Sequence, residues 1–402
     1  MATKMGNFFS SKKFLMIASF LGLYLFSAGA SWAAFSYFGT SSQSKFLSGG
    51  LGDSRSRINI DLPKTETCPI NGGMFTKIES DIWEERRPIA LIIENHVDAR
   101  PQSGLSKADV VYEAIAEGGI TRFLGIFYCG AAAEDVKAAP VRSARVYFID
   151  WAAEYGLNPI FMHVGGANDF AGFGDTAKLA QALELLATLD WRYPGGNDFD
   201  TTFDSGFPVF WRDYERLGKE VATEHTMMTS LDAAYEEAKD RGFNAKDPNG
   251  DKWDEDFTTW RFTDDSPSGS PTATKIELEF WSNKADYDVA WNYDSGSNSY
   301  LRENGGDKHI DHETGEQLFA KNVITLFVKE KGPVDRNKHM LYTTTGEGEA
   351  LVFQNGEVIE ATWEKDTRTD KTKFFDEKGK EISFVRGPIW IEAVPAGNTI
   401  DY

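Results

Sequence analysis

Several polar residues in this chain have the types and spacing that acid/base chemistry requires. Glu94 ends a short apolar run, His163 lies inside another, and Glu113 and Glu117 are four residues apart. Two nearby carboxylates raise one another's proton affinity, which acid/base catalysis often uses. We therefore take Glu94, Glu113, Glu117 and His163 as candidate proton carriers. The plainer interpretations are a solvated loop, a solvated acidic face and a hydrogen-bonded core histidine.

Arginines gather in the same part of the chain and suggest an anion site. The run from Pro140 to Arg145 places two arginines at a predicted helix start, with Ser143 as N-cap and a helix over 144–155. A helix N-terminus attracts anions, and guanidinium groups bind phosphate or carboxylate. In the alternative interpretation, the arginines pair with nearby glutamates inside the domain. The candidate ligand-binding residues are Asn95, His96, Arg100, Arg122, Arg142, Ser143 and Arg145.

The elements that position these residues can be predicted from hydrophobic pattern. Ile89–Ile93 is short, branched and uninterrupted, which is typical of a strand buried on both faces. Residues 109–129 fit a hairpin that turns at Gly118 and Gly119, although part of this segment also fits a helix. Residues 159–166 predict a second buried strand. If it is parallel to the first, His163 and His96 approach one rim of the sheet.

The two halves of the chain differ in their hydrophobic pattern. The first half adds predicted helices over 176–189 and 231–241, whereas short alternating runs from residue 272 onward predict antiparallel strands. We expect an α/β N-terminal domain over 83–245, a linker over 246–271, and a mainly antiparallel β domain, sandwich or small barrel, over 272–402.

The N-terminus carries an export signal. Lysines precede a mostly apolar stretch from Phe14 to Phe38 that is long enough to cross a bilayer. We predict a signal anchor in residues 1–38 that leaves the rest of the chain outside the cell. The alternative is a signal peptide cleaved near Ala30. A flexible stalk over 39–82, rich in Ser and Gly at first, follows this segment.

The amino-acid composition limits the classes of partner that this protein can bind. The formal net charge of −20 excludes general nucleic-acid binding, because such a surface repels a polyanion. The two cysteines, Cys68 and Cys129, fit an oxidising compartment, and a disulfide between them stabilises by about 4 kcal/mol in the chain-entropy description. Two free or buried thiols are the alternative. No nucleotide-loop or zinc-protease motif is present in the sequence, and we predict no metal or cofactor.

Three segments together resemble a known family. ENHVDARPQSGLSKADVVYEAIAEGGITRF, PVRSARVYFIDWAAEY and FMHVGG are similar to the YerB-like lipoprotein family, and the resemblance covers about residues 83–395. It implies a bacterial envelope protein with N- and C-terminal domains of unknown function, and it brings no catalytic residue. One departure is that no cysteine closely follows the apolar leader, so the residue that a lipoprotein lipidates is missing there.

Three function hypotheses follow. The first is an exported, membrane-anchored envelope protein that binds an anionic ligand, either a cell-wall glycopolymer or its phosphorylated precursor. The second is an enzyme on such a substrate. The third is a scaffold whose β domain meets another protein. A carboxylate of raised pKa among the arginines favours the enzyme, and arginines taken up by internal ion pairs favour the scaffold.

Overall fold

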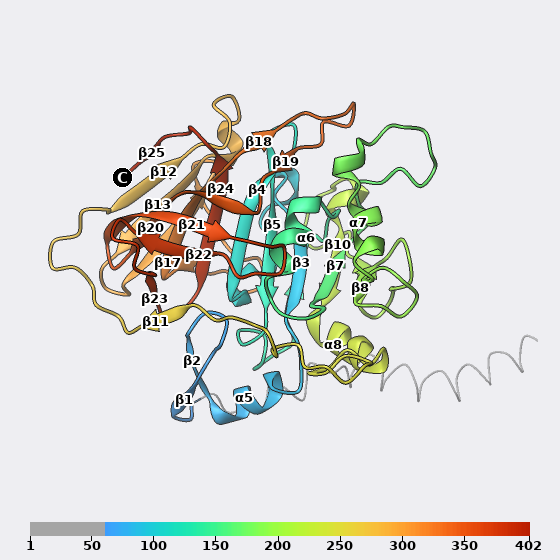
Figure 1. Cartoon of the computed structure of the whole chain (residues 1–402), viewed down its shortest axis with the longest axis horizontal. Coiled ribbons are helices and arrows are strands. Elements are labelled where there is room, and N and C mark those ends of the chain that lie inside the picture. The colour runs from blue at the N-terminus through green and yellow to red at the C-terminus, as the bar shows by residue number, and fades with distance from the viewer. Residues whose placement is uncertain (1–60) are drawn as a thin grey trace, which may run out of the picture. The chain divides into compact units, whose positions relative to one another are not determined.

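A ten-stranded sheet runs through both halves of the chain in this computed structural model, which describes residues 61–402 (Figure 1). Its central strands come from both the N-terminal and the C-terminal half. In spatial order the strands are β22 (Lys373–Asp376), β21 (Glu357–Lys365), β20 (Gly346–Gln354), β17 (Asn322–Val328), β24 (Ile389–Pro395), β4 (Val110–Glu117), β5 (Ile120–Phe127), β3 (Ile89–Glu94), β7 (Ile160–His163) and β8 (Asp198–Asp200).

The N-terminal strands confirm the predicted pattern. All six residues of β3 are buried, as expected for a strand covered on both faces, and β3 pairs in parallel with β7. Strands β4 and β5 form the predicted hairpin rather than a helix. Gly118 and Gly119 make its turn with φ angles of 60° and 83°, which glycine adopts without the strain that a Cβ brings.

The C-terminal strands form two sheets that pack face to face. The second sheet contains β15 (Asp307–Lys308), β14 (Ser299–Asn304), β13 (Val289–Asp294), β12 (Lys275–Leu278) and β25 (Ile400–Asp401), with β16 (Phe319–Ala320) beside β14. Trp291 of this sheet meets Trp390 of β24 with ring centroids 5.3 Å apart. The fold is therefore an α/β N-terminal region followed by a mainly antiparallel β sandwich, as predicted.

The two regions meet in the large sheet itself. Strand β24 pairs in parallel with β4 from Ile389 opposite Val110 to Glu392 opposite Glu113. The segment predicted as a linker is also packed, since Trp253 and Trp260 within it are buried. Strand β11 (Arg261–Thr263) in that segment pairs with β23 (Ser383–Val385). A lone linker between separate cores would leave such residues exposed.

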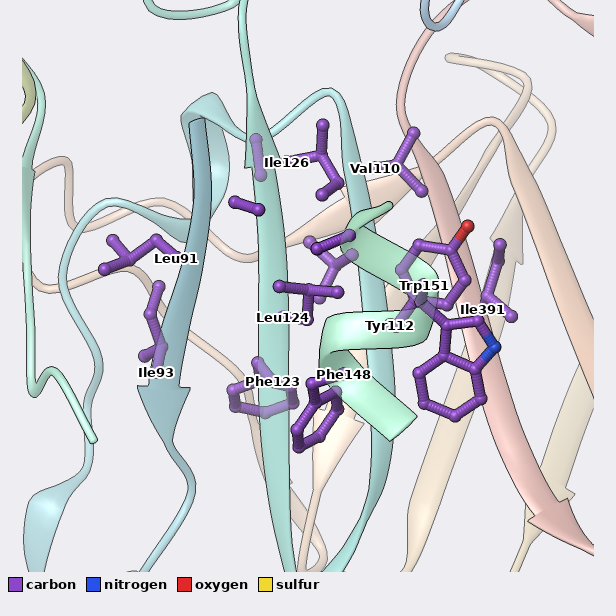
Figure 2. Close-up of a cluster of buried hydrophobic side chains, with 14 of the residues drawn as sticks. Leu91, Ile93, Val110, Tyr112, Phe123, Leu124, Ile126, Phe148, Trp151 and Ile391 are labelled. Carbon is purple, nitrogen blue, oxygen red and sulfur yellow. The ribbon is translucent and has the colours of Figure 1, made fainter. Parts of the chain in front are cut away.

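Short helices cover the N-terminal half of the sheet. Helix α6 packs across β4 and β5, where Trp151 stacks on Tyr112 at 5.3 Å and Phe148 lies close by (Figure 2). The predicted helix over 176–189 is in fact broken, because a 3-10 turn precedes α7. The helices are α5 (Lys77–Trp83), α6 (Val146–Ala152), α7 (Ala182–Thr188) and α8 (Leu231–Asp240), with 3-10 turns η2 (Val97–Ala99), η3 (Leu105–Lys107), η4 (Lys178–Ala180), η5 (Thr223–His225) and η6 (Ala285–Tyr287).

Small sheets complete the fold. Strand β10, next to α8, joins two segments of the N-terminal region, and β18 and β19 form a short ribbon in the C-terminal region. The strands are β1 (Lys64–Thr67) with β2 (Met74–Thr76), β6 (Lys137–Ala138) with β10 (Met227–Ser230) and β9 (Phe210–Arg212), and β18 (Glu330–Lys331) with β19 (Leu341–Tyr342). In the described part of the chain, residues 61–402, no helix is long and apolar enough to span a membrane. The predicted span Phe14–Phe38 lies outside that part.

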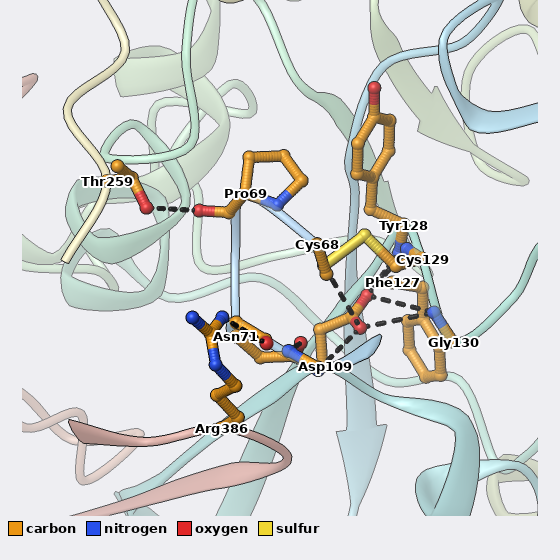
Figure 3. Close-up of a disulfide and its surroundings, with 12 residues drawn as sticks. Cys68, Pro69, Asn71, Asp109, Phe127, Tyr128, Cys129, Gly130, Thr259 and Arg386 are labelled. Carbon is orange, nitrogen blue, oxygen red and sulfur yellow. Dashed lines mark hydrogen bonds between the residues drawn. A yellow bond between two sulfur atoms is a disulfide. The ribbon is translucent and has the colours of Figure 1, made fainter. Parts of the chain in front are cut away.

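The end of the predicted stalk is ordered, which corrects its boundary at residue 82. Cys68 forms a disulfide with Cys129, with the Cα atoms 6.0 Å apart (Figure 3). Asn71 donates to the Asp109 carboxylate at 2.8 Å. Burial raises the pKa of Asp109 to about 7, although backbone donors, that of Tyr128 first, lower it. The crosslink and these hydrogen bonds fix residues that composition alone marks as flexible.

Candidate functional site

The predicted proton carriers come from strands that run in one direction. Strands β3, β7 and β8 are mutually parallel neighbours, and β3 and β4 are both antiparallel to β5. Glu94 and Glu117 therefore end their strands on the same edge of the sheet, where open α/β sheets commonly bind ligands. His163 ends β7 on this side as well. The sequence pattern predicted that the strand beginning at Ile89 runs out at Glu94, but it placed His163 inside a strand over 159–166, whereas β7 ends at His163. The side-chain partners had to come from the structure.

Glu117 holds two of the predicted arginines. Its carboxylate accepts from Arg122 at 2.9 Å and from Arg145 at 2.6 Å. Burial by itself raises the pKa of Glu117, but the two guanidinium groups outweigh burial and lower the pKa to about 2. A carboxylate that stays ionised down to such a pH is a poor general acid. Glu117 therefore acts here as a counter-ion for the two arginines.

Glu94 holds the third arginine and a histidine that the sequence analysis did not select. Arg142 Nε lies 3.0 Å from one carboxylate oxygen, and His225 Nδ1 lies 2.8 Å from the other. The Arg142 side chain remains 28% exposed, and its terminal nitrogens have no hydrogen-bond partner among residues 61–402. His225 follows β3 by more than 130 residues, so no local sequence signal links it to Glu94.

The ion pairs of Glu117 and those of Glu94 are connected through the main chain at Ser143. Arg122 Nη1 donates to the Ser143 carbonyl at 2.8 Å, and Ser143 is the neighbour of Arg142. We call this set the arginine edge; it consists of Glu94, Glu117, Arg122, Arg142 and Arg145. Three guanidinium groups face two carboxylates in direct ion pairs. The exposed Glu224 also lies near, since Arg142 and His225 both help to lower its pKa after its own backbone hydrogen bond.

Ser143 does not cap a helix, which corrects that prediction. Helix α6 begins at Val146 with Arg145 as N-cap residue, and no side chain caps it. Ala144 forms a bridge with Gly166, and Arg142 N donates to Ile92 O, so this segment lies extended between β3 and β7. The Ser143 hydroxyl donates instead to Val164 O at 2.9 Å.

Glu113 does not pair with Glu117, and the physical reason is a β-bulge. The register of β4 against β5 shifts between Ile115 and Glu117, so the two carboxylates leave the shared face that regular alternation predicts. The Glu113 carboxylate is instead fully buried and pairs with Arg302 of β14. It also accepts from Asn95 at 3.0 Å and from Thr121 at 2.5 Å.

A buried charged network surrounds this pair, and we call it the core network. It consists of Glu113, Arg302, His309 and Glu392, all buried, and it links the N-terminal and C-terminal regions. Burial and the neighbouring Glu113 raise the pKa of Glu392 well above its ordinary value. Sequence reasoning missed this carboxylate pair. The only signal was a single acid, Glu392, inside the apolar run of β24.

Arg100 and Asn95 belong beside the core network rather than the arginine edge. Arg100 donates through Nε to Asn95 Oδ1 and through Nη2 to Asn95 O, each at 3.1 Å. Its guanidinium lies 5.1 Å from the Tyr287 ring centroid. Asn95 is fully buried and also accepts from Asn304 at 2.8 Å. Of the four predicted arginines, the structure thus brings three together.

His163 is a core histidine. Its Nε2 lies 2.5 Å from Asp198, its Nδ1 lies 2.7 Å from Gly165 O, and the side chain is fully buried. Burial lowers the pKa of His163, but the ion pair with Asp198 outweighs burial and leaves the pKa raised. Both ring nitrogens are therefore occupied. His96 does not share a site with His163, because its ring stacks on His225 with centroids 4.9 Å apart.

The fold defines a class of protein in which two sequence regions share one sheet, a disulfide crosslinks the beginning of the described residues 61–402, and a charged edge lies at the strand termini. Comparison with known families gives the particular one. The family described as Protein of unknown function (DUF3048) matches twice, its N-terminal domain over residues 75–244 and its C-terminal domain over residues 276–391. The chain belongs to this family.

Individual relatives agree with this assignment and confirm the predicted YerB-like resemblance. The chain is 33% identical over 337 residues to the protein named "Putative lipoprotein YerB" of Bacillus subtilis. The aligned region covers 83% of this chain and 88% of that relative. A crystal structure of YerB protein from Bacillus subtilis matches with a TM-score of 0.64 and 27% identity. That match covers 84% of this chain and the whole of the solved chain.

Proposed function

We propose that this chain is an exported bacterial envelope protein that binds an anionic ligand at the arginine edge. The observation that carries the proposal is Arg142. Its Nε faces Glu94, but its terminal nitrogens have no partner among residues 61–402, and the side chain is partly exposed. A planar guanidinium with free N–H groups suits phosphate or carboxylate. A phosphorylated cell-wall precursor or an anionic glycopolymer has this chemistry.

The proposed location rests on three observations. The leader has the lysines and the apolar length of an export signal. A disulfide fits a compartment outside the cytoplasm. The similar Bacillus protein bears the name of a lipoprotein. We propose that the N-terminal segment Phe14–Phe38 holds this chain at the cell membrane, with cleavage near Ala30 as the alternative.

Catalysis has less support than binding. Glu117 stays ionised with a pKa of about 2, and the side chains of Glu113 and His163 are enclosed by hydrogen bonds in the interior. Glu392 has a raised pKa beside an arginine, as the enzyme hypothesis asks, but it is completely buried. A substrate cannot reach a proton carrier that has no exposed surface.

A scaffold is the second candidate function, and a specific observation favours it. Arg122 and Arg145 are nearly buried, and their terminal nitrogens donate hydrogen bonds to Glu117 and to backbone carbonyls. Arginines used in this way stabilise the fold rather than recruit a ligand. Arg142 distinguishes the two candidate functions. Only the ligand-binding function requires its side chain to stay accessible.

The test is thermal unfolding of the full-length protein with diphosphate, a phosphorylated polyprenol or an anionic glycopolymer. We compare wild type with Arg142→Gln and with the control Arg386→Gln. Arg386 is 29% exposed and pairs with Asp264 through Nε at 2.9 Å, so it matches Arg142 in exposure and in its Nε ion pair, although its Nη1 also donates to Gly72 O at 3.1 Å. A ligand at a hundred times its Kd adds about 2.7 kcal/mol of stability.

We expect one ligand to stabilise wild type and Arg386→Gln but not Arg142→Gln. Equal stabilisation of all three proteins would move the binding site away from the arginine edge. No stabilisation by any of the anions would favour the scaffold.

A further inference from the structure

Two histidines and an aspartate from distant parts of the chain meet beside the arginine edge. His96 lies just before η2 and Asp98 lies within it, shortly after β3. His225 ends η5. One ligand atom from each residue lies within 4.8 Å of the other two. The chain has six histidines in all, and two of them stack here with rings inclined by 18°. We propose that His96, Asp98 and His225 bind a divalent transition-metal ion, zinc foremost.

The orientation of His225 supports this proposal. Its Nδ1 lies 2.8 Å from Glu94 Oε2, and Arg142 Nε lies 3.0 Å from the other carboxylate oxygen. With Nδ1 donating to the carboxylate, Nε2 is the nitrogen that can bind a metal ion. Metal-bound histidines commonly donate their other N–H to a carboxylate in this way, which fixes the tautomer and the ring orientation.

The other two residues lie nearer the surface, and His96 Nδ1 accepts a hydrogen bond from Asp98 N at 3.2 Å, which metal binding through Nδ1 would replace. The side chains of His96 and Asp98 are 29% and 66% exposed, and His96 Nδ1 lies 3.6 Å from the Asp98 carboxylate. Zinc binds nitrogen and oxygen at about 2.0–2.2 Å, so two ligands of one ion are at most about 4.3 Å apart. The His96 and His225 rings are stacked and inclined by only 18°, so their in-plane lone pairs do not converge. The partly exposed His96 ring has to turn out of the stack before all three ligand atoms reach one ion.

The donor set decides the class of metal. Two imidazoles and one carboxylate suit zinc and neighbouring transition metals, whereas magnesium and calcium require mainly oxygen ligands. Three protein ligands also leave one coordination position open, because zinc is usually four-coordinate. No local sequence pattern links His96 to His225, because the two residues are 129 positions apart. This proposal departs from our sequence-based expectation of no metal.

The metal proposal does not rest on anion binding by Arg142. Glu94 lies between the two, since one oxygen faces Arg142 and the other faces His225. An ion at the histidines and an anion at the arginine can each bind without the other. The two proposals therefore need separate variants.

The experiment uses full-length protein that has been stripped with a chelator and titrated with Zn²⁺ against a chromogenic competitor. The variants are His96→Ala, Asp98→Asn and His225→Gln. The control is His312→Ala, because His312 is 34% exposed and lies 3.5 Å from Glu313, a similar local pair outside the cluster. Substitution with Co²⁺ adds a visible spectrum that reports nitrogen and oxygen ligation.

We expect one equivalent of Zn²⁺ in wild type and in His312→Ala, and binding at least about tenfold weaker in the three variants. Asp98 is exposed and His96 is half-buried, so we expect these two variants to fold even if His225→Gln is unstable. Less than one equivalent in wild type, or equal affinity in His96→Ala and Asp98→Asn, would overturn the proposal. Anion-dependent stabilisation that persists in His96→Ala would show that the two sites fail or succeed independently.

Discussion

The core network and the arginine edge contain the same chemical groups in different surroundings. Each joins glutamates to arginine and has a histidine partner, but Arg302 and Glu113 are fully buried whereas Arg142 and Glu117 are each 28% exposed. A buried charge must be paired, because removing its partner leaves it without water or counter-ion. A partly exposed charge tolerates the loss of its partner. Burial therefore separates groups that stabilise the fold from groups that remain available to a ligand.

The largest effect should come from Arg302→Met. This change leaves Glu113 buried without its counter-ion, and we expect the free energy of unfolding to fall by about 3–5 kcal/mol in urea titrations. Arg142→Met is the matched control at the arginine edge. Its loss should be smaller, about 1–2 kcal/mol, because the Arg142 side chain is 28% exposed and the buried Glu94 keeps His225 as its partner. Similar losses in the two variants would remove the distinction between the regions.

The two glutamates of the core network should differ from each other. Burial and the neighbouring Glu113 raise the pKa of Glu392 well above its ordinary value and so favour the neutral form, which glutamine resembles; Glu392→Gln should therefore change the unfolding free energy by about 1 kcal/mol or less. Glu113→Gln breaks the ion pair with Arg302, and about 3 kcal/mol should be lost. Urea unfolding at pH 7 measures both values. The reverse ranking would mean that Glu392 carries the charge.

The lowered pKa of Glu117 predicts that the stability of the folded protein decreases in acid. The pKa is about 2 in the folded protein and near 4.5 in the unfolded chain, so its ion pairs stabilise fully above pH 4.5. That contribution is lost as the pH falls from 4.5 toward 2, and partial exposure limits it to about 2 kcal/mol. Glu117→Gln should remove this part of the pH profile in urea unfolding. The exposed Glu316→Gln should retain it.

The smallest effect should come from Ser143→Ala. The hydroxyl donates to Val164 O, so its loss should lower stability by about 1 kcal/mol. Because Ser143 does not cap α6, amide hydrogen exchange within Val146–Ala152 should change no more than the global stability requires. Selective fraying of the first turn of α6 would instead restore the capping role that the sequence suggested.

Local pattern was enough for the elements but not for the partners. The branched run Ile89–Ile93 and the pair Gly118 and Gly119 marked a buried strand and a hairpin, because side-chain burial and backbone freedom act over a few residues. The bulge near Ile115 is different. It arises where β4 meets β5, and it sends Glu113 and Glu117 to different surroundings that regular alternation did not predict.

By itself, the sequence determined the family, through three segments that resemble it, and the α/β and mainly antiparallel β regions, through composition and local periodicity. Only the tertiary structure decided that β24 joins β4, that Arg302 reaches Glu113, and that His225 stacks on His96. The physical reason is separation along the chain. Contacts between residues more than a hundred positions apart depend on the packing of the whole fold, which no local pattern contains.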